Sequence, residues 1–210
     1  MKQIALVIIV FISSFGFAQD AETLLNEVYE KTKSYNNISI DFKYVLQNTS
    51  ENIHQETRGD VIMEGDKYIL NILGITRIYD GKTLYTISPE DEEVTISSDN
   101  TEEESTITPS KMLSFYKDGY TYETDIVQNV KGRKIQYIKL NPIDTDSEIK
   151  QVLLGIDANT KHIYNLIEIG KNGTKTTLTV NSFKTNEPIS KTLFTFDKSK
   201  YGDYYINRLD

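Results

Sequence analysis

The sequence contains no cysteine and no tryptophan in its 210 residues. Without cysteine the chain forms no disulfide bond, and it offers no thiol to which a bacterial lipid anchor is attached. The hydrophobic core alone must therefore stabilise the fold. The roughly 190 residues that follow the predicted leader described below are enough for one such core.

Histidine is also scarce, because only His54 and His162 occur. They are far apart in the sequence and have no cysteine to complete a zinc site, so we interpret both as surface residues. The sequence has no nucleophile elbow, phosphate-binding loop or zinc-ligand spacing. The adjacent carboxylates Asp91, Glu92 and Glu93 fall in a predicted turn, where water solvates them. The sequence therefore predicts neither an enzyme nor a bound cofactor or metal.

Positive charge is in the minority, and the formal net charge is −8. Nucleic-acid binding requires a basic surface, so this balance argues against it, and it equally disfavours docking to an anionic membrane. The acidic run Asp99–Ser105 contains Glu102, Glu103 and Glu104. It lacks the spacing and the glycine of an EF-hand loop, so we predict a solvated loop rather than a calcium site.

No apolar run is long enough to span a membrane, but the first 18 residues have the organisation of a signal peptide. Lys2 provides the positive start, Ile4–Phe11 the apolar segment, and Gly16–Ala18 a small-x-small cleavage site. We expect cleavage after Ala18, export to the periplasm, and a single domain over residues 19–210. An uncleaved anchor is the less favoured alternative.

Alternating apolar and polar residues predict a mainly β fold. Ile38–Gln47 is the clearest strand, with Ile38, Ile40, Phe42, Tyr44 and Leu46 on one face. Residues 59–97 form an antiparallel meander of short runs with one apolar face. At Asp80–Gly81 we expect a type I′ hairpin turn. Further strands follow in the second half, at 120–130, 135–140, 149–156, 163–169 and 174–184, with a hairpin signal at Asn172–Gly173.

Two helices are predicted. The first begins at Asp20, ends at Asn36–Asn37 and has an apolar face that we expect to cover a sheet, composed of Leu24, Leu25, Val28, Tyr29 and Thr32. The second begins with the capping pair Thr108–Pro109 and ends at Gly119. Its body, Ser110–Lys117, is short yet rich in Met and aromatic residues. A packed connector and a mobile lid over a cavity both remain open for it.

About ten or eleven strands with two helices, and no linker or repeat, indicate one unit whose sheet must hide its apolar face. It can close into a barrel, stack on a second sheet, or curl with helices filling its mouth.

Several phrases, in order, resemble the LolA family of periplasmic lipoprotein carriers. They are Gly59–Met63, Lys67–Leu70, Tyr79–Tyr85, Ser88–Pro89 and Glu93–Ile96. Thr192–Asp197 resembles the family's terminal Phe-Thr-Phe strand, and Asn181–Asn186 is similar to the variant found in Bacteroidetes-type bacteria. The resemblance runs from about Leu24 to Leu209. It implies an incomplete, unclosed antiparallel β-barrel with a helical lid.

The sequence departs from the family at one position. Better-known members carry a basic residue, usually arginine, before a turn and an aromatic residue, and that arginine helps to hold the lid closed. Here the position falls on Glu64 or Gly65, while Tyr68 matches the aromatic residue. Arg58 and Arg77 are the nearby candidates to replace it.

The resemblance implies a soluble, monomeric periplasmic chaperone that takes acylated lipoproteins from an inner-membrane ABC transporter to an outer-membrane acceptor. The alternative is a sensor of lipids or lipoproteins with the same fold, or a carrier of another amphiphile. For acyl-chain binding we predict one face of the early strands and the second helix, namely Phe42, Tyr44, Val61, Met63, Tyr68, Leu70, Tyr85, Met112, Leu113, Phe115 and Tyr116. A closed core is the other interpretation for each of them.

Overall fold

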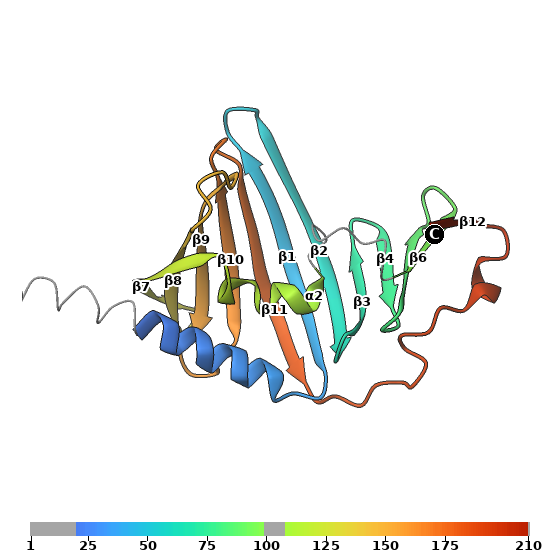
Figure 1. Cartoon of the computed structure of the whole chain (residues 1–210), viewed down its shortest axis with the longest axis horizontal. Helices are drawn as coiled ribbons and strands as arrows, with labels where there is room; N and C mark the ends of the chain where they lie inside the picture. The colour runs from blue at the N-terminus through green and yellow to red at the C-terminus, as the bar shows by residue number, and fades with distance from the viewer. Residues whose placement is uncertain (1–19, 99–107, 210) are drawn as a thin grey trace, which may run out of the picture. The chain divides into compact units, whose positions relative to one another are not determined.

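The structure is a computed structural model that describes residues 20–98 and 108–209 (Figure 1). The predicted signal peptide and the acidic run Asp99–Ser105 lie outside these residues. Within the described part of the chain, no helix has the length and apolar character needed to cross a membrane.

Twelve strands hydrogen-bond in the order β12-β6-β5-β4-β3-β2-β1-β11-β10-β9-β8-β7. Their bounds are β1 Ile38–Asn48, β2 Ile53–Glu64, β3 Lys67–Ile72, β4 Ile75–Tyr79, β5 Thr83–Ser88, β6 Glu93–Ser98, β7 Tyr120–Val130, β8 Arg133–Pro142, β9 Ile149–Asp157, β10 Ile163–Gly170, β11 Lys175–Thr185 and β12 Tyr205–Leu209. The pairs from β2 to β6 and from β7 to β11 are antiparallel, whereas β12 pairs with β6 in parallel. The order ends at β12 and β7 without closing. The predicted mainly β, unclosed sheet is confirmed, and the described residues form twelve strands in place of the predicted ten or eleven.

The chain divides into two compact units. Within the described residues, unit 1 comprises 20–34, 45–55 and 115–179, and unit 2 comprises 35–44, 56–98, 108–114 and 180–209.

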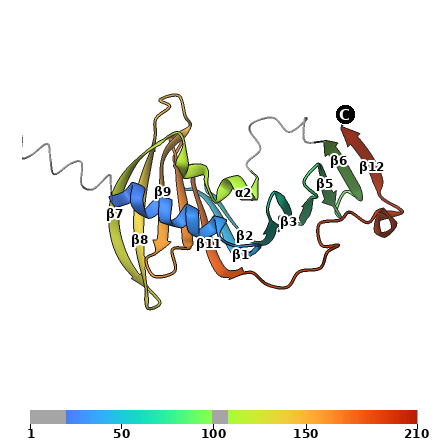
Figure 2. The same cartoon turned by 60° about the horizontal axis from the view of Figure 1, so that its bottom comes forward.

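In unit 1 the first helix, residues 20–33, lies across the strands (Figure 2). Ala21, Leu25 and Val28 are its most buried residues, at 0–3% exposure, and their spacing of four and three places them on one side of the helix. Ile138 and Leu154, both fully buried, are cross-strand neighbours on β8 and β9. The predicted role of this helix as sheet cover is therefore confirmed, although Leu24, Tyr29 and Thr32 are only half-buried.

In unit 2 the strands β4 to β6 carry a core cluster on one face, made of Ile78, Ile87, Val94 and Ile96. The segment between β11 and β12 covers it. Phe196, Tyr201 and Tyr204 pack against the cluster, and the short helix η2 (Lys198–Tyr201) lies within this segment. The predicted terminal strand at residues 192–197 is wrong, because these residues form turns and irregular backbone that bring the aromatic rings onto the sheet.

The second predicted helix is interrupted. It consists of α2 (Pro109–Met112) and the 3₁₀ turn η1 (Phe115–Lys117). The N-cap prediction is confirmed, since Thr108 Oγ1 accepts a hydrogen bond of 3.3 Å from the Lys111 amide. The amides of Leu113 and Ser114 bond to carbonyls three residues earlier, and these tighter bonds end the α-helix.

Two turns differ from the prediction. The hairpin at Asp80–Gly81 is present, but only Gly81 has positive φ, and the Asp80 carboxylate accepts hydrogen bonds from the amides of Lys82 and Thr83 at 2.9 and 2.8 Å. It is therefore an Asx-type turn rather than type I′. The Leu73–Gly74 turn between β3 and β4 was not predicted. Both its residues have positive φ, and Leu73 is 67% exposed.

Candidate ligand-binding face

The predicted acyl-binding residues divide between the two units. Phe115 and Tyr116 belong to unit 1, and the other nine belong to unit 2.

In unit 2 the strand register places four of the predicted residues on one face. Met63 pairs with Tyr68 across β2 and β3, and Val61 pairs with Leu70. Because the side chains of a strand alternate, these four point the same way. The row continues through Tyr79, whose ring lies 5.6 Å from that of Tyr68, and then through Leu84. We call this surface the apolar face of unit 2.

Phe42 joins the apolar face through Gly59. A Cβ on Gly59 would lie 2.5 Å from Phe42 Cζ, so the ring rests directly on the glycine backbone. Gly59 lies two residues before Val61 on β2, so the two residues lie on the same face of the strand. Tyr44, two residues after Phe42, is half-buried.

Tyr85 lies on the opposite face of the sheet. It pairs with Ile78 and Ile96, and its ring stacks on Phe196 at 4.6 Å. The expectation that Tyr85 shares one face with Tyr68 is therefore wrong. The cause is register, because Tyr68 continues through Tyr79 to Leu84 rather than to Tyr85.

The apolar face is closed in this structure. Phe42, Val61, Met63 and Tyr68 are only 2–6% exposed. Leu70 and Leu113 are half-buried, and Met112 in α2 is 37% exposed. A ligand would have to take the place of the protein atoms that cover these side chains. Their role in acyl-chain binding stays a prediction.

Arg77 is the charged residue of the apolar face. It stands in the cross-strand row Val61–Leu70–Arg77–Thr86. Arg58 is the other candidate for the family's latch arginine. It is exposed, and its side chain points to the opposite face of β2 from that of Val61. Of the two, Arg77 alone shares a face with Val61, Met63, Tyr68 and Leu70.

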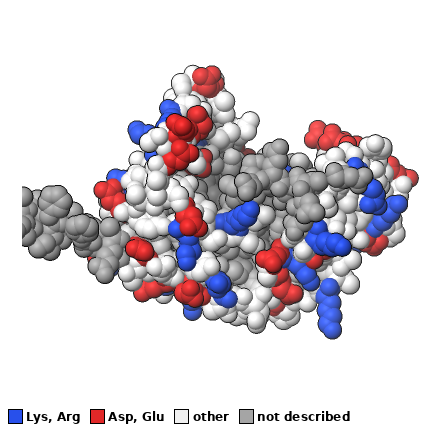
Figure 3. Space-filling view, viewed as in Figure 1, with Lys and Arg blue, Asp and Glu red and all other residues white. Residues whose placement is uncertain are grey.

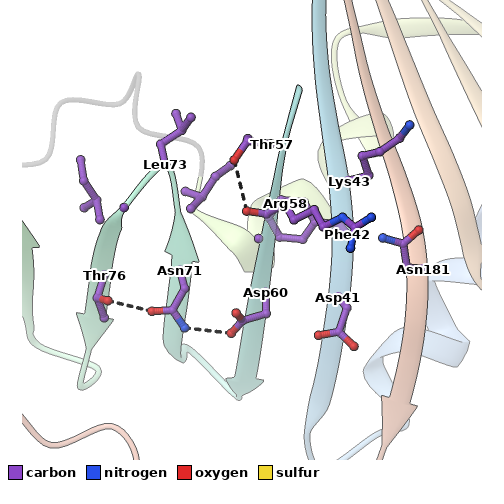
Figure 4. A pocket seen from close by; sticks show the side chains of 14 residues that line it. Asp41, Phe42, Lys43, Thr57, Arg58, Asp60, Asn71, Leu73, Thr76 and Asn181 are labelled. Atoms are coloured by element: carbon purple, nitrogen blue, oxygen red, sulfur yellow. Dashed lines mark hydrogen bonds between the residues drawn. The ribbon is translucent and has the colours of Figure 1, made fainter. Parts of the chain in front are cut away.

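A pocket of about 710 Å³ in unit 2 includes Phe42 and Gly59 in its lining but is lined largely by polar side chains (Figure 4). Asn71 bridges two strands there, since its amide donates to Asp60 at 2.8 Å and its oxygen accepts from Thr76 at 2.8 Å. Phe42 is the predicted residue that reaches this pocket. The polar lining does not match the expected apolar cavity.

In unit 1, Phe115 and Tyr116 belong to an aromatic cluster. The Phe115 ring meets those of Tyr116 and Tyr120 edge-on, at 5.7 and 5.8 Å. The Tyr122 hydroxyl donates to the Tyr116 carbonyl at 2.8 Å and also reaches the Lys117 carbonyl at 3.1 Å. This cluster holds η1 against β7.

Tyr116 is the most enclosed member of the cluster, at 1% exposure. Its hydroxyl has no hydrogen-bond partner among the residues that the structure describes. Burial, followed by the neighbouring Tyr29 and Tyr122, raises the pKa of this hydroxyl. An unpaired buried hydroxyl costs stability.

Sequence reasoning missed Glu168 of β10. It pairs with Val152, and burial raises the pKa of its carboxyl. The sequence contained a signal, because Leu166 and Tyr164 lie two and four residues before Glu168 and therefore share its face of the strand. The glutamate was passed over because charged residues normally face solvent.

The two histidines lie in different surroundings. His54 is exposed and 3.1 Å from Gln47 Nε2. His162 is half-buried, and burial followed by the charge of Lys31 lowers its pKa. Residues 20–98 and 108–209 contain no group of three His, Cys, Asp or Glu residues able to hold a metal ion.

Charged side chains of both signs are intermixed on the surface drawn in Figure 3. Within residues 20–98 and 108–209 the ion pairs are Lys43–Glu56 at 3.3 Å, Lys161–Glu27 at 2.6 Å and Lys139–Glu123. All are at least partly exposed, so each contributes little to stability.

Solved structures with similar folds share little sequence with this chain. An uncharacterized conserved protein from Thermus thermophilus is 12% identical, with a TM-score of 0.57, and the match covers 90% of this chain and 99% of that one. A LolA superfamily protein from Nitrosomonas europaea is 13% identical, with a TM-score of 0.43 and coverages of 84% and 98%. The lipoprotein LppX from Mycobacterium tuberculosis is 15% identical, with a TM-score of 0.47 and coverages of 80% and 98%. The Thermus protein supports the fold alone.

No curated protein matches the sequence. The profile of the family described as outer membrane lipoprotein carrier protein LolA matches residues 33–197, which are most of the chain. This match contains nearly all the strands described above and every predicted acyl-binding residue. The chain therefore belongs to the LolA family of outer membrane lipoprotein carrier proteins.

Proposed function

We propose that this protein is a periplasmic carrier that binds the acyl chains of lipoproteins and takes them from the inner to the outer membrane. The observation that carries the proposal is the family match over residues 33–197. The sequence adds a predicted signal peptide that ends at Ala18. An inner-membrane ABC transporter would load the carrier, and an outer-membrane acceptor would unload it.

The apolar face of unit 2 suits this task energetically. Each acyl methylene removed from water contributes about 0.8 kcal/mol, so a long chain is held without any covalent bond. The face combines Met63 with the tyrosines Tyr68 and Tyr79, and methionine adapts easily to ligands of different shape. Since the face is closed, part of the binding energy is used to displace the protein's own cover. That cost keeps the acyl chain releasable.

The first experiment is native mass spectrometry, with lipid extraction, of the protein purified from the periplasm of its own host. We expect a bound acylated lipoprotein. A different bound amphiphile would overturn lipoprotein as the cargo, while the apolar site would stand. A protein that carries no ligand and takes up no added acyl chain would overturn the carrier function.

A matched pair of variants tests the site itself. Leu70→Asp places a carboxylate on the half-buried apolar face, whereas Leu73→Asp places one on the exposed turn, where aspartate tolerates the positive φ. Uptake of a fluorescent long-chain fatty acid should fall strongly in Leu70→Asp and persist in Leu73→Asp. Equal uptake by both folded variants would place the acyl site elsewhere.

A further inference from the structure

The polar pocket of unit 2 carries charged side chains of both signs. Asp41 and Asp60 are its acidic lining residues, and Lys43 and Arg58 are its basic ones, so the formal charges of the lining cancel. All four belong to unit 2. A ligand with charge of a single sign is attracted by one pair and repelled by the other. The lining therefore suits a ligand that carries both signs.

The contact between Phe42 and Gly59 shows how these charges are arranged. β1 and β2 are neighbours in the sheet and follow each other through the turn at residues 49–52, so they run antiparallel. A Cβ on Gly59 would lie 2.5 Å from Phe42 Cζ, which places the two residues opposite each other. The aspartates come before Phe42 and after Gly59, and the basic residues come after Phe42 and before Gly59. Two levels result, and Figure 4 shows the aspartates at one height and Lys43 and Arg58 at another.

Both levels stand on the opposite side of the sheet from the apolar face of unit 2. Each charged residue is next to Phe42 or Gly59 in its strand, and neighbouring side chains of a strand point to opposite faces. Two residues along a strand span about 6–7 Å, which is therefore the approximate separation of the acidic and basic levels. The charged site and the predicted acyl-binding residues Val61 and Met63 thus lie on different faces.

Three of the four charges have no ion pair within residues 20–98 and 108–209, namely those of Asp41, Asp60 and Arg58. Lys43 is the exception, because its Nζ lies 3.3 Å from Glu56 Oε2. Like charges on neighbouring strands are unfavourable when nothing compensates them. A ligand with the complementary charges compensates both levels at once.

Asn71 and Thr76 hold the acidic level in place. The Asn71 amide donates to Asp60 Oδ2 at 2.8 Å, and the Thr76 hydroxyl donates to Asn71 Oδ1 at 2.8 Å. All three side chains are half-buried and line the pocket. The amide of Asn71 has a second N–H, and Asp60 has a second carboxylate oxygen, so each can also bond a ligand.

We propose that this pocket binds a zwitterion, with an ammonium group at Asp41 and Asp60 and a phosphate or carboxylate group at Arg58. The planar guanidinium of arginine matches both anions with two parallel hydrogen bonds, and a carboxylate accepts strong hydrogen bonds from an ammonium group. The site goes beyond the proposed carrier function, because it needs no acyl chain and lies on the other face of the sheet.

The test uses three soluble probes without an acyl chain. Glycerophosphoethanolamine carries both charges, glycerol phosphate carries only the negative group, and ethanolamine carries only the positive one. Each is titrated into the nitrogen-15-labelled mature protein at pH 7, and amide chemical shifts give both the affinity and the place of binding. We expect the shifts to centre on Gly59, Asn71 and Gly74, which line the pocket.

Two substitutions remove one charge each, and each has a matched control. Arg58→Gln removes the basic group, and Arg208→Gln makes the same change at an exposed residue outside the pocket. Asp60→Asn removes the acidic group but keeps an oxygen that can accept from the Asn71 amide, and Asp203→Asn is its exposed control. Circular dichroism confirms that the variants fold.

We expect glycerophosphoethanolamine to bind more tightly than either single-charge probe. Arg58→Gln and Asp60→Asn should each weaken its binding roughly fivefold or more, because each removes a charge-assisted contact. The controls should bind it as wild type does. The proposal is overturned if the zwitterion has no advantage, if the controls lose as much affinity, or if the shifts fall outside the pocket. None of these results bears on acyl-chain uptake, so the carrier function stands or falls separately.

The zwitterion has two natural sources, a lipid headgroup and a short peptide. A titration with diglycine, whose ammonium and carboxylate groups are also a few bonds apart, is compared with that of glycerophosphoethanolamine. Tighter binding of glycerophosphoethanolamine assigns the pocket to phosphoethanolamine headgroups, and tighter binding of diglycine assigns it to peptides. Binding of neither probe overturns the proposal.

Discussion

Replacing Gly59 by alanine should destabilise the protein by about 2–3 kcal/mol, since overpacking a filled site costs roughly 1–3 kcal/mol and two neighbours are affected here. The new Cβ would lie 2.5 Å from Phe42 Cζ and 2.6 Å from the Asn71 carbonyl oxygen. Ordinary contacts between carbon atoms are about 3.5–4.0 Å, so both neighbours must retreat by roughly 1 Å. Phe42 is 5% exposed, and the Asn71 oxygen belongs to the backbone of β3. Neither can move freely.

Thermal and urea unfolding followed by far-ultraviolet circular dichroism measure this loss. For a chain of this size about 1 kcal/mol corresponds to ~2–4 °C, so the melting temperature should fall by roughly 4–12 °C. The control is Gly202→Ala, because Gly202 has φ of −61° and ψ of −30° and nothing within 4 Å of a new Cβ. That change should be neutral or slightly stabilising.

The double variant Gly59→Ala with Phe42→Leu separates the two clashes. The shorter side chain removes the ring contact but leaves the Asn71 carbonyl in place, so the double variant should be more stable than the sum of the two single effects predicts. Coupling between contacting residues is typically about 0.5–3 kcal/mol. Additive effects of the two substitutions would show that Phe42 does not rest on Gly59. So would a Gly59→Ala variant whose stability lies within about ±0.5 kcal/mol of wild type, which is the ordinary scale of a surface substitution.

Three further changes test unit 1 by thermal unfolding. Burial raises the folded-state pKa of Glu168, so the native state loses stability as pH rises through that pKa. Glu168→Gln should therefore raise the melting temperature at pH 7.5, and this gain should vanish near pH 4. An equal gain at both pH values would refute the raised pKa of Glu168. Tyr116→Phe removes a buried hydroxyl without a described partner and should stabilise by about 1 kcal/mol, whereas a loss would mean that the hydroxyl is hydrogen-bonded. Gly155→Ala would drive its Cβ into the Asn165 amide oxygen and should cost about 2 kcal/mol or more; unchanged stability would contradict the placement of Asn165.

The sequence by itself determined the elements whose signals are local. Alternation along Ile38, Ile40 and Phe42 predicted β1, and all three are buried as expected. Thr108 and Pro109 predicted the start of α2, because a capping hydroxyl and a missing amide act within one turn of backbone. Such signals depend on near neighbours, and no distant contact is needed to interpret them.

Only the tertiary structure determined what each face of a strand packs against. Alternation gives each strand two faces, but one residue of register across β4 and β5 separates Tyr85 from Tyr68. The cover over Tyr85 comes from Phe196, more than a hundred residues later, and no local pattern specifies that contact. The strand expected at residues 192–197 came from the family resemblance, and the structure has turns and irregular backbone there.

The tertiary structure also determined the surroundings of the charged side chains. Glu168 and Arg77 each alternate with apolar residues in their strands, so either face was open to them on sequence grounds. Register across neighbouring strands places both beside hydrocarbon, Glu168 next to Val152 and Arg77 next to Leu70. Local periodicity fixes the direction of a side chain relative to its own strand, whereas its dielectric surroundings depend on every strand and segment packed around it.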